Sequence, residues 1–211
     1  MKKIVLWILI GLVVLGIAFA AFIAYEMHQA GRMIVKKPAL YLYPIEDSLI
    51  TVQVNVNGEL INAIPEYENG WTVWVTKDGM IEQTYDYLFY EAQLHKIDLP
   101  NEGWVVAYAD LESWFDEYLI KFGLNEKEKN QFKDYWLNEL PTSKYYEIKL
   151  LDEQFLDENM NLIISPKPDT KIRLNFYFTP LKEEISIPEP NIITPERNGF
   201  TVIEWGGILE K

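Results

Sequence analysis

The sequence of 211 residues contains no cysteine and only two histidines, His28 and His95. Without cysteine the chain has no disulfide, thiolate nucleophile, zinc ribbon or iron–sulfur ligand. Two histidines cannot build a His-rich metal site, and a Ser-His-Asp triad would need His95 as its base. The sequence also lacks a Gly-x-Ser-x-Gly elbow and a phosphate-binding glycine loop. We therefore predict no metal site and no cofactor.

Basic residues are also scarce, because 19 Lys and Arg residues stand against 32 Asp and Glu residues, a net charge of −13. Phosphate backbones repel such a chain, so we expect no nucleic-acid partner. An anionic bilayer repels it in the same way, so the folded part of the chain is expected to stand away from the lipid surface.

Charged residues are missing from one long stretch near the N-terminus, residues 4–25. A helix of that length reaches about 33 Å, enough to cross a hydrocarbon core of about 30 Å. We predict that residues 1–30 form a signal anchor or transmembrane helix and that residues 31–37 form a stalk. The alternative is a signal peptide cleaved after Ala20, although the apolar run is longer than such a peptide usually has.

The charges that flank this run do not decide its orientation. Lys2 and Lys3 precede it, and Arg32, Lys36 and Lys37 follow it. The opposite topology would require the short charged tail to cross the membrane, so we expect that tail to stay in the cytoplasm. This predicts a single-pass protein of the cell membrane with an extracytoplasmic C-terminal domain, and a cytoplasmic domain on the same anchor is the alternative.

Residues 38–211 are predicted to form one β-rich domain. Residues 48–57 and 171–179 alternate between apolar and polar side chains, the period of a half-buried strand. Asn57-Gly58 follows the first of these segments and predicts a hairpin.

A helical insert interrupts the strands at about residues 110–140. Apolar residues recur at helical spacing from Leu111 to Phe122. Asn125 and Glu128 have the spacing of a capping box at the start of a second helix. The sequence therefore predicts a mainly β fold, with antiparallel sandwich-like sheets and an inserted αα-hairpin, preceded by one N-terminal transmembrane helix.

Four segments of this domain resemble one protein family. They are Lys37-Pro38-Ala39-Leu40-Tyr41-Leu42-Tyr43-Pro44, Tyr67-Glu68-Asn69-Gly70-Trp71, Tyr87-Leu88-Phe89-Tyr90-Glu91 and Gly199-Phe200-Thr201-Val202-Ile203-Glu204-Trp205-Gly206-Gly207. The chain is similar to uncharacterised bacterial proteins, membrane-anchored or secreted, that open with Lys-Pro-x-Ile-Tyr-Leu-Tyr-Pro and end with a Phe-Thr-Val-Ile-Glu-Trp-Gly-Gly block. Their middle block has Trp-Glu-Gly where this chain has Tyr90-Glu91-Ala92. The resemblance implies a fold and an envelope location but no mechanism.

Two carboxylates are candidate catalytic residues, Glu91 and Glu204, because each lies in an otherwise apolar, aromatic strand. Burial would raise the pKa of such a carboxyl group toward the range needed for acid catalysis. A glycoside hydrolase needs two carboxyl groups about 5–10 Å apart. The alternative is that each faces solvent or pairs with a cation such as Arg173 or Arg197.

Aromatic side chains are abundant, with 7 Trp, 13 Tyr and 10 Phe residues. Candidate ligand-binding residues are Trp71, Trp74, Tyr43 and Tyr90. Trp71 and Trp74 have opposite parity, so on a regular strand they face opposite sides. One of them can therefore lie on a ligand platform, and a second covered face is the alternative.

Three functional hypotheses follow. The first is a non-enzymatic module of the cell surface that binds an envelope protein or glycan. The second is a hydrolase of envelope glycan that uses Glu91 and Glu204. The third is a scaffold component whose contacts are made by the helical hairpin.

Overall fold

The structure is a computed structural model that describes residue 11 and residues 14–23, 33–95 and 97–210. It divides into two units, Met1–Arg32 and Met33–Lys211. Residues 14–23 of the first unit are helical. No helix within the described residues is long and apolar enough to span a bilayer. The expected anchor lies largely outside those residues, at positions 1–10, 12–13 and 24–30.

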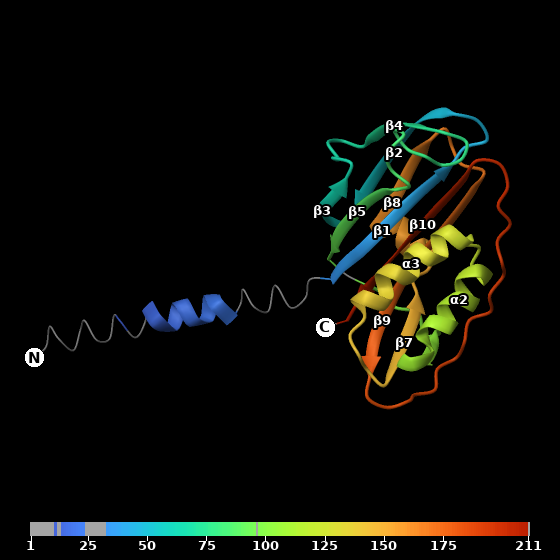
Figure 1. The fold of residues 1–211 in the computed structure, drawn as a ribbon. Coiled ribbons are helices and arrows are strands. Elements are labelled where there is room, and N and C mark those ends of the chain that lie inside the picture. Colours follow the sequence, from blue (N-terminus) through green and yellow to red (C-terminus); the bar gives the residue numbers. More distant parts are fainter. Residues whose placement is uncertain (1–10, 12–13, 24–32, 96, 211) are drawn as a thin grey trace, which may run out of the picture. The chain divides into compact units, whose positions relative to one another are not determined.

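The second unit is mainly β, as predicted, with a helical hairpin between its strands (Figure 1). Its helices are α2 (Leu111–Lys121), α3 (Glu126–Glu139) and α4 (Glu153–Asn159), with a 3₁₀ turn at Tyr108–Asp110. Its strands are β1 (Met33–Tyr43), β2 (Ser48–Val56), β3 (Gly58–Ile64), β4 (Trp71–Val75), β5 (Leu88–Leu94), β6 (Trp104–Ala107), β7 (Tyr145–Leu150), β8 (Met160–Ser165), β9 (Thr170–Leu181) and β10 (Thr201–Leu209).

These strands form two sheets. A seven-stranded sheet has the order β3-β5-β1-β10-β9-β7-β6, and a three-stranded sheet has the order β4-β2-β8. Strand β1 shows how the larger sheet buries both faces, because successive side chains of a strand point to opposite sides. Leu40 and Leu42 pack in the core shared with the three-stranded sheet. Ala39 and Tyr41 pack in the core beneath α2 and α3. The seven-stranded sheet is therefore the middle of three layers.

The helical hairpin agrees with its local sequence signals. The side chain of Asn125 accepts from the backbone N–H of Glu128, and the Glu128 carboxylate accepts from the backbone N–H of Asn125, so the capping box is formed. Gly123 ends the preceding helix with φ at 91°, a left-handed conformation that glycine adopts without strain. The two helices cover one face of the larger sheet with aromatic side chains.

Three expectations about the strands were wrong. Asn57-Gly58 does not close a hairpin, because β2 pairs with β4 and β8 whereas β3 pairs with β5 in the other sheet. The sheets are not all antiparallel, because β10 runs parallel to β9. This geometry arises because residues 182–200 lead the chain back to the end of the sheet where β9 begins. The stalk is shorter than expected, because β1 already begins at Met33.

Candidate functional site

Glu204, one of the two candidate catalytic carboxylates, lies fully buried between the two sheets. Its Oε1 accepts a hydrogen bond from the hydroxyl of Tyr90 at 2.6 Å. Its Oε2 accepts from Nε of Arg173 at 2.7 Å and from the side-chain amide of Asn175 at 3.0 Å. Both carboxylate oxygens are thus occupied by donors of the domain itself.

The cation of this cluster is held from several sides. The Arg173 guanidinium also donates to the backbone oxygen of Met160 at 2.7 Å and to Asp157 at 3.3 Å. Burial acts to lower the pKa of Arg173, but the neighbouring groups, Glu204 foremost and then Tyr90 and Asp157, together outweigh burial and raise that pKa. Burial, reinforced by the charge of Glu204, raises the pKa of Tyr90. The cluster is a buried, hydrogen-bonded ion pair, an arrangement that fixes a core rather than one that turns over a substrate.

Glu91 does not join Glu204. It follows Tyr90 on β5, and Tyr90 faces the core that contains Glu204, so Glu91 points to the other face of the seven-stranded sheet. Its charge is one of the causes that raise the pKa of Tyr135 on α3, which places it on the helical side. The two carboxylates therefore do not share the cleft that a two-carboxylate hydrolase requires.

Among the aromatic candidates, Trp71 and Trp74 point to opposite sides of β4, as their opposite parity predicts. Trp71 is 3% exposed and its indole N–H donates to the backbone oxygen of Pro65 at 2.9 Å. Tyr90 is buried beside it, with ring centroids 6.5 Å apart. Trp74 is 44% exposed on the outer face of the three-stranded sheet. Only Trp74 of these three presents its ring to solvent.

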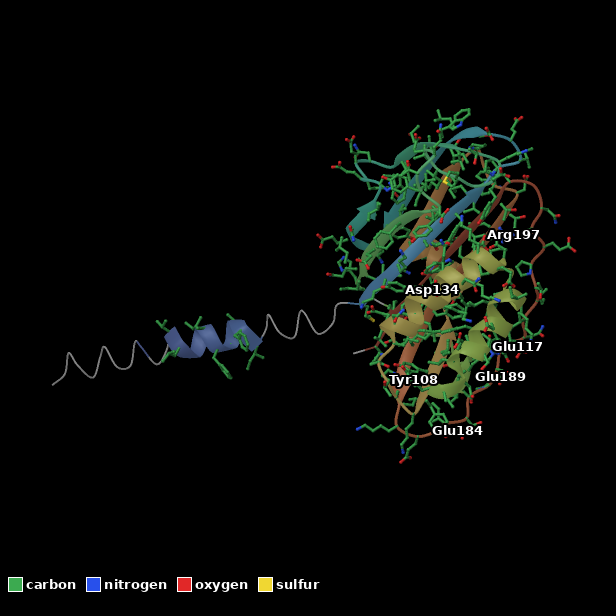
Figure 2. All side chains as sticks on the ribbon, in the orientation of Figure 1. Tyr108, Glu117, Asp134, Glu184, Glu189 and Arg197 are labelled. Carbon is green, nitrogen blue, oxygen red and sulfur yellow. The ribbon has the colours of Figure 1, made fainter. Side chains whose placement is uncertain are left out.

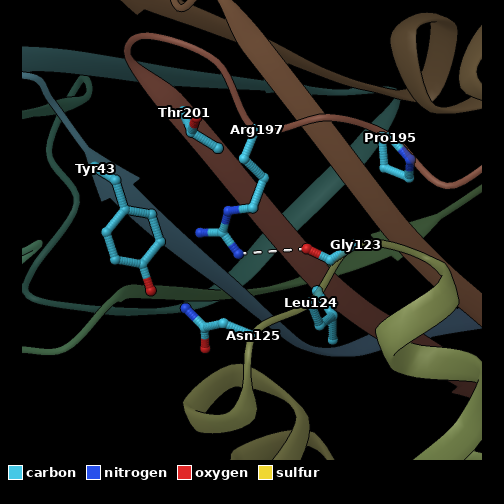
Figure 3. A pocket seen from close by; sticks show the side chains of 7 residues that line it. All are labelled: Tyr43, Gly123, Leu124, Asn125, Pro195, Arg197 and Thr201. Carbon is cyan, nitrogen blue, oxygen red and sulfur yellow. Dashed lines mark hydrogen bonds between the residues drawn. The ribbon is translucent and has the colours of Figure 1, made fainter.

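Tyr43 lines an open hollow of about 610 Å³ between the end of β1 and the link of the helical hairpin. Arg197, which also lines the hollow, lies near the start of α3 (Figure 2). Figure 3 shows the guanidinium of Arg197 between Tyr43 and the backbone oxygen of Gly123, to which it donates at 3.3 Å. The guanidinium carbon lies 5.0 Å from the centre of the Tyr43 ring.

The cation in this hollow is already neutralised. Arg197 makes two parallel hydrogen bonds to the fully buried carboxylate of Glu128, at 2.8 and 3.0 Å. Bidentate pairs of this kind hold both partners in a fixed geometry. Burial raises the pKa of Tyr43, and the charge of Glu128 adds to the shift. The arrangement ties residues 182–200 to the helical hairpin, and we interpret it as a structural clasp.

The outer face of the three-stranded sheet differs from the rest of this acidic domain in having no charge. None of the residues of β2, β4 and β8 is ionisable, whereas 24% of the whole chain is charged. The inward side chains of these strands supply the core between the sheets. Their exposed side chains are Leu49, Thr51, Gln53, Asn55, Thr72, Trp74, Ile163 and Ser165.

The strand register orders these side chains into rows. Trp74 pairs with Leu49, Thr51 lies between Thr72 and Ser165, and Gln53 pairs with Ile163. From Leu49 to Asn55 the face extends about 20 Å at about 3.4 Å per residue. An aromatic ring thus stands at one end of a strip in which hydroxyl and amide groups are joined by two exposed aliphatic side chains, Leu49 and Ile163. We name this strip, defined by the eight exposed residues above, the uncharged face.

The backbone of Trp74 is held in place by a residue at the free edge of β4. The backbone N–H of Trp74 donates to a carboxylate oxygen of Glu82 at 2.6 Å, and the backbone N–H of Glu82 donates to the Trp74 oxygen at 2.9 Å. Glu82 adopts a φ of 48°, which is unfavourable for a residue with a side chain. The loop therefore adopts a strained conformation that fixes the strand position carrying the exposed ring.

Sequence reasoning identified Trp74 but not the rest of the uncharged face. The signal was present in the absence of charge from three strands that are distant in the sequence. It could not be used without knowing that residues 160–165 pair with β2.

Fold and surface together define a mainly β domain with a buried ion pair in its core and an uncharged face that carries an exposed tryptophan. No family model matches the chain, and no solved structure matches it. It is 49% identical over 61 residues to the "Uncharacterized protein in bglA 3'region" of Butyrivibrio fibrisolvens. The match covers 26% of this chain and 64% of that relative, so the chain spans less than two thirds of the relative's length.

Proposed function

We propose that this protein is a non-catalytic binding module of the bacterial cell envelope. Its N-terminal segment holds it at the membrane, and the uncharged face binds a neutral polysaccharide chain. The observation that carries the proposal is the exposure of Trp74 at the end of a strip without any charged side chain.

The chemistry of the face suits a sugar polymer. The C–H groups of a pyranose ring pack against an indole, and its hydroxyl groups exchange hydrogen bonds with amide and hydroxyl side chains. Such a polymer brings no charge, so an uncharged face avoids the desolvation of ions on binding. The strip is about 20 Å long, so an extended polymer can contact several of its residues at once.

Two observations favour binding over hydrolysis. Glu204 is sealed in an ion pair, and Glu91 lies on the opposite side of the sheet. None of the eight residues of the uncharged face carries a carboxylate, and Glu82 at its edge binds the Trp74 backbone N–H.

The test is calorimetric titration of the full chain, kept in mild detergent, with envelope polysaccharides separated into neutral and charged fractions. Saturable binding to a neutral fraction, without release of reducing ends, supports the proposal. Binding to charged fractions alone, or cleavage of the polymer, contradicts it.

A further inference from the structure

A second surface lies on the larger sheet, along the edge at which β6 is the terminal strand. The backbone N–H of Tyr108 donates to Lys144 of the neighbouring chain segment, in register with the β6–β7 pairing. Backbone groups alternate between the two sides of an antiparallel strand. Those of Trp104 and Val106 therefore bond to β7, whereas both groups of Val105 and the N–H of Ala107 point to the free edge.

Residues 182–200 run past this edge without completing it. Within the described part of the chain they contribute one backbone bond, from the N–H of Gly103 to the oxygen of Pro188 at 2.9 Å. Proline has no N–H to donate and its ring restricts the backbone, so Pro188 and Pro190 prevent this segment from continuing as a strand. Among the described residues, the N–H and C=O of Val105 and the N–H of Ala107 remain open to a partner, whereas the Ala107 carbonyl accepts the first bond of the 3₁₀ turn at Tyr108–Asp110.

A groove of about 400 Å³ follows this open edge. Its apolar wall consists of aromatic side chains from the strands and from α2. They are Trp104, Trp114, Tyr118 and Tyr145. Trp104 is 2% exposed, and its indole N–H has no hydrogen-bond acceptor among the described residues.

The rim of the groove is acidic. Asp110, Glu117, Glu184 and Glu189 line it. Figure 2 shows three of them, Glu117, Glu184 and Glu189, on the side formed by α2 and residues 182–200. Lys121 is close by, bonded to Glu117 at 2.5 Å and 4.7 Å from the centre of the Tyr118 ring. One lysine against four carboxylates leaves the rim negative.

We propose that this groove is a strand-addition site for an extended, basic peptide segment of a partner protein. The peptide backbone pairs with both groups of Val105 and accepts from the N–H of Ala107, and main-chain bonds of this kind provide affinity without regard to sequence. Alternate side chains of the added strand face α2. Lysine or arginine at those positions meets the acidic rim and the aromatic wall, which attract cations by charge and by the ring quadrupole. The site is separate from the uncharged face and does not depend on it.

The probe is a fluorescein-labelled, end-capped heptapeptide in which lysine alternates with valine and threonine, and the readout is fluorescence anisotropy with the full chain in mild detergent. We expect saturable binding that the double variant Glu184→Lys/Glu189→Lys weakens at least tenfold. The matched control is Glu66→Lys/Glu68→Lys, which makes the same charge change at exposed positions away from the groove and should leave the affinity within about twofold.

A second probe separates strand pairing from simple attraction between charges. It is the same heptapeptide with N-methyl groups on alternate backbone nitrogens, which removes the donors while keeping every charge. The proposal predicts at least tenfold weaker binding of this peptide. Equal binding of the two peptides, equal losses in the two double variants, or no saturable binding would each overturn the assignment.

Discussion

The replacement of Trp74 by alanine should weaken polysaccharide binding by about tenfold. A tryptophan side chain presents up to about 250 Å² of surface, and Trp74 is 44% exposed, so about 110 Å² is available to a ligand. Covering all of it at about 25 cal/mol per Å² would give about 2.8 kcal/mol. A sugar chain covers one side of the ring, so about half of this, about 1.4 kcal/mol, is the expected loss.

The assay is the titration of the neutral polysaccharide fraction against wild type, Trp74→Ala and Trp74→Phe. Phenylalanine keeps a smaller ring, so its affinity should fall between the other two. Ile45→Ala is the matched control, because Ile45 is 75% exposed and lies outside the uncharged face. Equal affinities for wild type and Trp74→Ala, or an equal loss in Ile45→Ala, would refute the reasoning.

Three further predictions concern the buried groups. Glu204→Gln removes the buried counter-charge of Arg173 and leaves only Asp157 at 3.3 Å. It should lower the free energy of unfolding by about 3 kcal/mol, measured by urea denaturation. Glu91→Gln is the control, and equal small effects of the two variants would contradict the assignment. Burial raises the pKa of Tyr146 to about 12, so the unfolded chain loses the phenol proton at a lower pH than the folded chain does. The contribution of Tyr146 to the free energy of unfolding is therefore complete below about pH 10 and is lost as pH rises toward 12. Tyr146→Phe should flatten that part of the stability–pH curve, and an unchanged slope would count against it. Arg197→Ala breaks the clasp to Glu128 and should speed limited proteolysis within residues 182–200, and unchanged cleavage there would show that the clasp does not hold the segment.

The parts of the fold that were predictable are those encoded by neighbouring residues. The capping box of Asn125 and Glu128 was identified correctly because both partners lie within one turn. The opposite exposures of Trp71 and Trp74 followed from parity alone. Alternation also located β2 and β9.

Strand partners could not be predicted in the same way. Asn57-Gly58 has the local chemistry of a hairpin, yet β3 gains its partner from β5. Pairing depends on which apolar faces pack together across the whole chain, and a two-residue turn signal carries no information about that. The parallel pairing of β9 and β10 likewise depends on the long return through residues 182–200.

The candidate site likewise combines features that the local sequence predicts with features that depend on distant strands. Glu204 was identified as unusual because a carboxylate lay in an apolar strand, and the structure explains it by Arg173 and Tyr90. Tyr90 comes from β5, across the sheet, so that contact was not visible in the sequence. The uncharged face could be assembled only when three distant strands were placed side by side.

The most direct test of the central claim is a map of the residues that respond to the neutral polysaccharide. In nuclear magnetic resonance spectra of the isotope-labelled chain, we expect the largest shifts at the Trp74 indole N–H and at the backbone amides of Thr51 and Thr72. The amides beside Glu204 and those of the helical hairpin should stay unchanged. Shifts centred on α2 and α3, with no change at Trp74, would contradict the account.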